Sequence, residues 1–227
     1  KRASAGAIIL AQGGMEAKLM LRHGEQQLLS IIIPLAILIG TARLESSTGH
    51  GLHEVFPMVL AVAATSAGFT GQAISLAFDR RYGALKRTGA SGVPAWAIIG
   101  GKIIGVLTMV VFQILVLGAT AFALGLRISA PGILLMIVSL IFGVAAFTAM
   151  GLVLGGTLSS EAVLALANLI WFILLAIVGW ALYSQGLGDN GLLNIVPTVA
   201  LAGALADASN STFPGIELIS LTAWLAV

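Results

Sequence analysis

Apolar residues in this chain gather in long runs that short polar stretches separate. The runs cover about 28–43, 57–77, 95–126, 133–154 and 162–182, and a sixth begins at 216 and extends to 227. A helix that crosses a bilayer needs ~20 apolar residues, whereas a strand of a membrane barrel needs ~10 that alternate with polar ones. The pattern therefore predicts an all-α integral membrane protein with a single transmembrane domain (1–227). We expect a six-helix bundle whose last span is truncated.

The first 27 residues differ from these runs because they are too polar to span. Apolar and small residues recur there at helical spacing, at Ala17, Met20, Leu21, Gly24 and Leu28. Polar side chains occupy the remaining arc, at Glu16, Lys18, Arg22, His23, Glu25 and Gln26. This pattern is typical of an amphipathic helix in the membrane interface, so we expect an interfacial helix over 1–27. The alternative is a solvated leader into the first span.

Segment 183–215, before the last run, also departs from the pattern. Its apolar part, 192–205, is too short to cross a bilayer, and Pro197 divides it. Gly, Asp and Asn residues flank that part on both sides. We therefore expect an outer re-entrant or interfacial hairpin of two half-helices before the last span.

The composition excludes a water-soluble domain and many kinds of enzyme. The chain is 59% hydrophobic and 9% charged, with a mean hydropathy of +1.07, whereas soluble domains carry roughly 25% charged residues. It contains no cysteine, which excludes disulfides and thiolate metal sites. The sequence also lacks a Ser-His-Asp set, an HExxH motif and paired carboxylates within the apolar runs. We expect no catalytic residues in this chain.

Two other stretches hold candidates for chemistry. His50, His53 and Glu54 lie close together in the polar connector 43–55, but without the i, i+4 spacing of paired histidine ligands. We expect a solvated loop there and no metal site. Gly101-Lys102 resembles the end of a phosphate-binding loop, yet the motif's first glycine and final Ser or Thr are missing. We expect no nucleotide site, and we expect Lys102 to extend back to the membrane interface.

Positive charge is concentrated in the polar segment 78–94. Four of the 11 Lys and Arg residues lie there, at Arg80, Arg81, Lys86 and Arg87. Basic loops stay on the cytoplasmic side of a membrane. If the N-terminus is cytoplasmic, nine basic residues face inward and only Arg43 and Arg127 face outward. We therefore expect a multi-pass protein of the plasma membrane with a cytoplasmic N-terminus, and no nucleic-acid partner.

Small and polar residues crowd the second half of 57–77, and an asparagine lies inside 162–182. Small residues let helices approach closely, and polar groups in hydrocarbon need a partner or water. Tight helix packing and the lining of a substrate path both explain this composition. Our candidates for the lining are Thr65, Phe69, Gln72, Asn168 and Phe172. Gly151 and Gly155, spaced by four, predict close packing near the end of the fourth run.

Two stretches carry a resemblance to a known family. The first joins Glu16 and the run Arg22-His23-Gly24-Glu25 to a first span that contains Pro34. The second is FDRRYGALKR over 78–87, followed by Ala90 and Pro94. Within the six-run layout, these stretches resemble the permease (transmembrane) subunits of ABC-2-type exporters. The chain departs from the family pattern by ending the second stretch Ser91-Gly92-Val93-Pro94, without a Thr-Pro pair.

The resemblance implies a permease that forms a dimer in the lipid bilayer with an identical or related protomer. It also implies a separate cytoplasmic ABC ATPase subunit that binds ATP and Mg²⁺, with no cofactor in this chain. In the family, the ATPase contacts the basic segment, the N-terminal helix and the turn before the fifth span. The matching ATPase-coupling residues are Arg22, Glu25, Asp79, Arg80, Arg81, Gly83, Leu85, Lys86, Arg87, Pro94 and Glu161.

The expected function is ATP-driven export of amphipathic or lipid-like compounds, such as drugs, lipids or polyketides, out of the cytoplasm. Two alternatives stay open at this point. One is a secondary transporter or channel without an ATPase, and the other is an integral membrane lipid-handling enzyme or assembly factor. Acidic residues are nearly absent from the apolar runs, which disfavours a transporter driven by a proton or sodium gradient.

Overall fold

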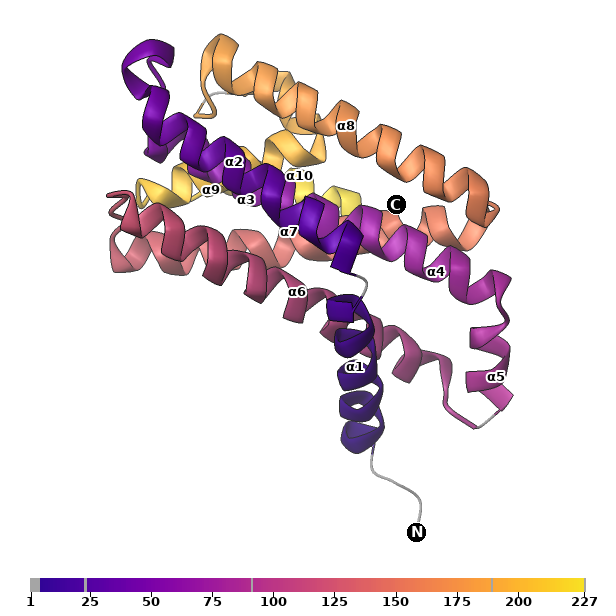
Figure 1. The fold of residues 1–227 in the computed structure, drawn as a ribbon. Helices are drawn as coiled ribbons and strands as arrows, with labels where there is room; N and C mark the ends of the chain where they lie inside the picture. Colours follow the sequence, from indigo (N-terminus) through magenta and orange to yellow (C-terminus); the bar gives the residue numbers. More distant parts are fainter. Residues whose placement is uncertain (1–4, 23, 91, 189, 227) are drawn as a thin grey trace.

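The computed structural model describes residues 5–22, 24–90, 92–188 and 190–226. Within these residues the regular secondary structure is helical, and the long helices pack side by side in a bundle (Figure 1). Four helices are long and apolar enough to cross a membrane, Leu52–Arg81, Trp96–Ala123, Ala130–Thr157 and Ser160–Gln185. Two shorter apolar helices are Ser30–Leu44 and Gly215–Leu225. The all-α membrane class is confirmed, while six crossings and a re-entrant hairpin stay predictions.

The elements follow one another along the chain with short connections. They are α1 (Ala5–Arg22), α2 (Gly24–Thr48), α3 (Leu52–Thr65), the π-helical turn η1 (Ser66–Thr70), α4 (Gly71–Arg81), α5 (Ala84–Ala90), α6 (Ala95–Ala123), α7 (Ala130–Thr157), α8 (Ser160–Gln185), the 3₁₀ turn η2 (Gly191–Ile195), α9 (Pro197–Ser209) and α10 (Gly215–Leu225). Elements α3, η1 and α4 are continuous. Together they form one long helix, which we call the central helix.

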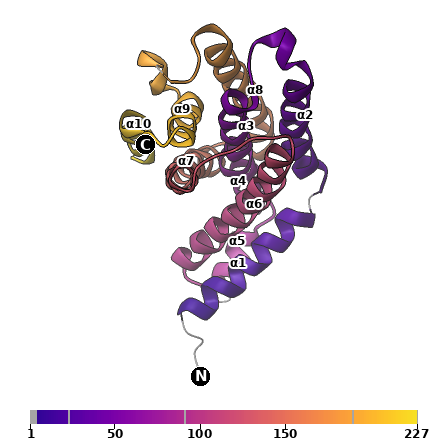
Figure 2. The ribbon, with the colours of Figure 1, turned by 90° about the vertical axis from the view of Figure 1, so that its left-hand side faces the viewer.

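The central helix is the most deeply buried of the four long apolar helices. Helices α2, α6, α7, α8 and α9 all pack against its α3 part, and every side chain from 55 to 65 is buried. Figure 2, which looks along the bundle, shows α3 and α4 between α8, α6 and α7. The run predicted at 57–77 lies inside this helix. Its small residues are therefore explained by tight packing within the protomer.

Glycines bring α7 into direct contact with the central helix. A methyl group added at Gly151 would lie 2.6 Å from the carbonyl oxygen of Phe69. One added at Gly155 would overlap the carbonyl oxygen of Ala73. The backbones of the two helices thus touch where both α7 residues lack a side chain. The close packing predicted from this glycine pair is confirmed.

The prediction of a polar loop over 43–55 is wrong for most of its length. Helix α2 continues to Thr48 and α3 begins at Leu52, so only 49–51 lie outside a helix. Gly49 adopts φ +72°, a left-handed conformation that glycine takes without steric cost, and this ends α2. Most of this stretch therefore belongs to the ends of two helices rather than to a loop.

Segment 78–94, predicted as a polar interruption, is also largely helical. The central helix extends to Arg81, and α5 occupies 84–90. Gly83, at φ +67°, terminates the central helix, and its N–H donates to the Arg80 carbonyl at 3.2 Å. Pro94, with φ −72°, directly precedes α6. The basic residues are therefore held on a helix–turn–helix rather than on an irregular loop.

Serine caps set the starts of α7 and α8. The Oγ of Ser129 accepts a hydrogen bond from the Gly132 N–H at 3.1 Å, and that of Ser159 accepts one from the Ala162 N–H at 3.4 Å. Such caps satisfy N–H groups that the first helical turn leaves free. Both helices consequently begin earlier than the predicted starts at 133 and 162.

Helix α1 leaves the bundle as an arm that lies along the first half of α6 (Figures 1 and 2). The contact is close because both helices carry glycine there. A methyl group at Gly13 would lie 2.6 Å from Ile104, and one at Gly101 would lie 2.5 Å from Gln12. The helix predicted over 1–27 is observed over 5–22, and residues 24–27 belong to α2. Its position in the membrane interface stays a prediction.

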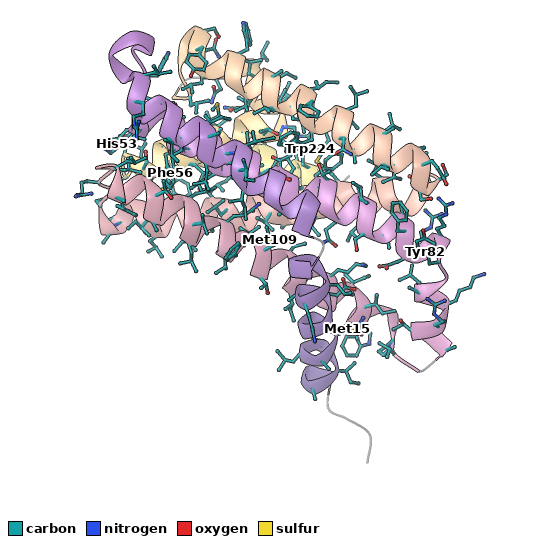
Figure 3. The ribbon with its side chains drawn as sticks, viewed as in Figure 1. Met15, His53, Phe56, Tyr82, Met109 and Trp224 are labelled. Atoms are coloured by element: carbon teal, nitrogen blue, oxygen red, sulfur yellow. The ribbon has the colours of Figure 1, made fainter. Side chains whose placement is uncertain are left out.

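The segment expected to form an outer hairpin contains one helix and one 3₁₀ turn rather than two half-helices. Pro197 begins α9, where its fixed φ and missing N–H suit the first helical position. Every side chain from 197 to 205 is buried, and α9 packs against α3 and α7. The turn η2 is joined to α10 by Trp224, whose Nε1 donates to the Ile195 carbonyl at 2.9 Å (Figure 3).

Candidate functional site

The end of the central helix is fastened to the turn between α7 and α8 by two arginines. Arg80 Nη1 donates to the carbonyl oxygens of Gly155 at 2.7 Å and Leu158 at 3.2 Å. The last carbonyls of a helix lack intrahelical partners and carry partial negative charge, which favours a cation there. Arg80 therefore caps the C-terminal end of α7.

Arg81 contacts the beginning of the next helix, α8. Its Nη1 donates to the Ser160 Oγ at 3.1 Å and forms an ion pair with Glu161 Oε1. The side chains of Arg81 and Glu161 are about half and two-thirds exposed. Exposed pairs of this kind contribute little to stability, so the contact matters chiefly for how it positions the two elements.

A cleft of about 580 Å³ lies between the α4–α5 end of the central helix and the α7–α8 turn. We call it the basic cleft. Helix α5 supplies one wall and the α7–α8 turn the other, and its lining residues are Ala77, Arg80, Arg81, Leu85, Lys86, Leu158, Ser159, Ser160 and Glu161. Tyr82 lies beside it at the tip of the central helix, stacked on Phe78 and 63% exposed (Figure 3). The basic cleft and the neighbouring Tyr82 together expose basic groups and an aromatic ring at one end of the bundle.

Apart from Asp79, the predicted coupling residues fall into three groups. Arg80, Arg81, Leu85, Lys86 and Glu161 meet at the basic cleft. Gly83 and Pro94 lie in the connections on either side of α5. Arg87, in α5, donates from Nη1 to the Tyr82 carbonyl at 2.8 Å and so caps α4. Arg22 and Glu25 lie next to the α1–α2 junction, and their side chains fall outside the described part of the structure.

Asp79 points away from the cleft, toward α6 and α1. Its Oδ2 accepts a hydrogen bond from Lys102 Nζ at 2.6 Å. The same ammonium donates to the Ser75 Oγ at 3.1 Å and lies 3.5 Å from Glu16 Oε1. Lys102 is only 2% exposed, so the expectation that it extends to the interface is wrong. Two carboxylates and a hydroxyl hold its ammonium inside the protein instead.

The candidate path residues lie at two places in the bundle, three on the central helix and two on α8. Thr65, Phe69 and Gln72 are buried inside the protomer, where Thr65 Oγ1 donates to the Ala61 carbonyl at 2.7 Å. Asn168 and Phe172 instead line a pocket of about 120 Å³ between α2, η1 and α8, with Ser30, Ile33, Ser66, Thr70 and Trp171. The structure brings Asn168 and Phe172 together, but with Ser66 and Thr70 rather than with the other three candidates. Their role in a path stays a prediction.

One of three comparisons with known proteins gave a match. A family model described as ABC-2 type transporter matches residues 13–187, which is more than three quarters of the 227 residues. The chain belongs to the ABC-2 type transporter family. The match extends from α1 through α8 and includes the basic cleft and Lys102. Comparison with curated proteins and with solved structures gave no match.

Membership in the ABC-2 family establishes the general function of the chain. The chain is a multi-pass membrane protein and the permease component of an ABC transporter, a transport component rather than an enzyme in its own right. Members of this family normally work with an ABC ATPase. The ABC-2 match and the four apolar helices therefore agree on a membrane transport subunit.

Proposed function

We propose that this permease is the membrane subunit of an ATP-driven exporter that moves amphipathic or lipid-like compounds out of the cytoplasm. It acts as a dimer with an identical or related protomer in the plasma membrane, with its N-terminus in the cytoplasm. ATP and Mg²⁺ bind to a separate ABC ATPase subunit. The basic cleft carries this proposal, because it is the surface on which that subunit docks.

The arginine contacts support the basic cleft as a docking surface. Arg80 and Arg81 bond the end of the central helix to the α7–α8 turn, which lies across the cleft from α5. A force applied to the cleft consequently reaches three of the four apolar helices at once. The exposed Lys86 and Tyr82 offer charge and an aromatic ring to a partner surface.

The pocket at Asn168 and Phe172 supports a substrate passage between protomers. Its volume, about 120 Å³, is below the ~300 Å³ at which ligand cavities begin, so one protomer does not enclose an amphipathic compound. Phe172 is more than half exposed, on the face where α2 and α8 flank the pocket. We place the passage at the dimer seam along this face. Closure of the ATPase tilts α2, the central helix and α8 and thereby opens it.

Co-purification tests the docking surface. The tagged permease is isolated in mild detergent from cells that express its ATPase, and the bound subunit is identified by mass and by ATP hydrolysis. The test variant reverses two exposed charges, Lys86→Glu with Arg87→Glu, and the control reverses exposed Arg43 at the opposite end of the bundle, Arg43→Glu.

We expect the wild type and Arg43→Glu to retain the ATPase. We expect the double reversal to lose at least about 90% of it, since like charges brought together at an interface cost several kcal/mol. Gel filtration of each variant shows whether the permease itself is folded. A folded double reversal that keeps its ATPase contradicts the proposal.

A further inference from the structure

Lys102 is a buried cation at which three helices meet. It belongs to α6, and its ammonium contacts Asp79 and Ser75 of α4 and Glu16 of α1. Lys102 is 2% exposed, whereas the Asp79 and Glu16 side chains are 32% and 12% exposed. One positive charge therefore lies between two partly buried carboxylates. The Lys102 ammonium is expected to stay with these carboxylates, because a buried charge without a partner costs free energy.

The position of Asp79 gives this contact its significance. Asp79, Arg80 and Arg81 are consecutive residues in the last turn of the central helix, and successive helical residues point about 100° apart. Asp79 faces α6 and α1, while the two arginines face the α7–α8 turn. This single turn is thus bonded on one side to the basic cleft and on the other to Lys102.

The packing of the helices makes Lys102 a link between two groups of elements. Helix α4 packs against α7, α8 and α5, whereas α1 packs chiefly against α6. The glycine contacts at Gly13 and Gly101 hold α1 directly on α6. Lys102 lies next to Gly101 and joins this α1–α6 pair to α4. Movement of the cleft therefore reaches the arm through the ion pairs of Lys102.

We propose that Lys102 is a positioning residue that transmits movement of the basic cleft to the α1–α6 arm. This inference rests on the proposed function, since an ATPase supplies the movement. Replacing the charged trio by neutral side chains of similar shape leaves packing in place, because buried ion pairs are seldom needed for stability. The neutral side chains do, however, remove the ion pairs and the hydrogen bonds of Lys102 that make α1 move with α4.

Distance measurements between spin labels test the proposal. The chain contains no cysteine, so pairs of introduced cysteines are labelled without background. One pair, Met15→Cys with Leu134→Cys, reports α1 against the far end of α7, and both positions are exposed. The other, Gly89→Cys with Leu134→Cys, reports α5, where the structure leaves open space for a side chain. Distances are compared in the permease–ATPase complex without nucleotide and after trapping with ATP and vanadate.

The test variant is the neutral trio Lys102→Met, Asp79→Asn and Glu16→Gln, and the matched control is Lys18→Met, which removes an exposed lysine of α1. In the wild type and the control we expect both distances to shift on trapping. In the neutral trio we expect the α5 shift to persist and the α1 shift to be lost. A purely structural role of Lys102 does not produce this selective loss.

Three results overturn the proposal, and they are distinguishable. An α1 shift that persists in the neutral trio shows that Lys102 does not transmit the movement. Loss of both shifts in a trio that still binds its ATPase shows a general structural role. Absence of any shift in the wild type removes the proposed ATP-driven function itself, and the role of Lys102 with it.

Discussion

At the residue scale, a polar cluster distinct from that at Lys102 lies at the end of the bundle opposite the basic cleft. Glu217 of α10 is buried, and its Oε1 accepts a hydrogen bond from Asn194 Nδ2 at 3.0 Å. Asp207 of α9, outside the four long apolar helices, lies near this carboxylate. Partial burial, and then the negative charge of Glu217, raise the pKa of Asp207 above its usual value. Ionised Asp207 is therefore less favourable in the folded protein than in the unfolded chain.

Because the pKa of Asp207 is raised, we expect Asp207→Asn to stabilise the permease at neutral pH but not at pH 3. A carboxyl group whose pKa is raised by folding contributes its full stability below its ordinary value of 3.8, and this contribution is lost as the pH rises through the raised value. We expect the melting temperature of Asp207→Asn to exceed that of the wild type at pH 7 and to match it near pH 3. Thermal melting in detergent across this pH range measures the difference. If Asp207→Asn melts below the wild type at pH 7, the proposed raised pKa of Asp207 is contradicted.

At the element scale, the contact between α7 and the central helix yields a second prediction. A side chain at Gly151 meets the backbone carbonyl of Phe69, which cannot move aside without shifting a helix. We expect Gly151→Ala to destabilise the permease by about 1–3 kcal/mol, the usual cost of overpacking. Thermal melting or denaturant titration of the purified protein measures this change.

Gly179→Ala is the matched control for this contact. Gly179 also lies inside a long helix, α8, but a methyl group there meets nothing within 4 Å. Alanine is the better helix former by up to ~1 kcal/mol, so we expect Gly179→Ala to be neutral or stabilising. If both substitutions change the stability of the permease equally, then the loss of a glycine, rather than the contact between α7 and the central helix, explains the effect.

The sequence pattern predicted the long helices well because a membrane makes apolar length nearly sufficient evidence for a helix. It failed at 43–55 and 78–94, where polar residues were assigned to loops. Polar side chains at helix ends reach water and do not stop the helix. Gly49 and Gly83, with positive φ, mark the true ends, but glycine is too common in this chain for that signal to stand out.

The candidate sites were predictable to different degrees. The residues of the basic cleft followed from the family resemblance, because its motif is local in sequence. Lys102 was missed as a link because its partners come from 23 and 86 positions away in the chain, at Asp79 and Glu16. The path residues come from two helices, and the sequence does not show which faces of these helices meet. Thr65, Phe69 and Gln72 of the central helix are buried, whereas Asn168 and Phe172 of α8 line a pocket with Ser66 and Thr70.

At the scale of the whole molecule, the distribution of charge predicts the orientation in the membrane. Positions at the basic end should be cytoplasmic, and positions near η2 should face outward. We expect a membrane-impermeant maleimide to label Leu192→Cys in intact cells and to label Gly89→Cys only after the membrane is permeabilised. Since the chain has no cysteine of its own, each label reports one position. The reverse labelling pattern contradicts the predicted orientation.

Site-specific photo-crosslinking in intact cells tests whether the ATPase binds at the basic cleft. A benzophenone side chain replaces Tyr82 beside the basic cleft or, as control, Phe213 at the opposite end, and both aromatic residues are highly exposed. After irradiation, we expect a covalent adduct between the permease and its ATPase from position 82 and none from position 213. An adduct from position 213, or none from position 82 in a complex that still contains the ATPase, would show that the ATPase does not bind at the basic cleft.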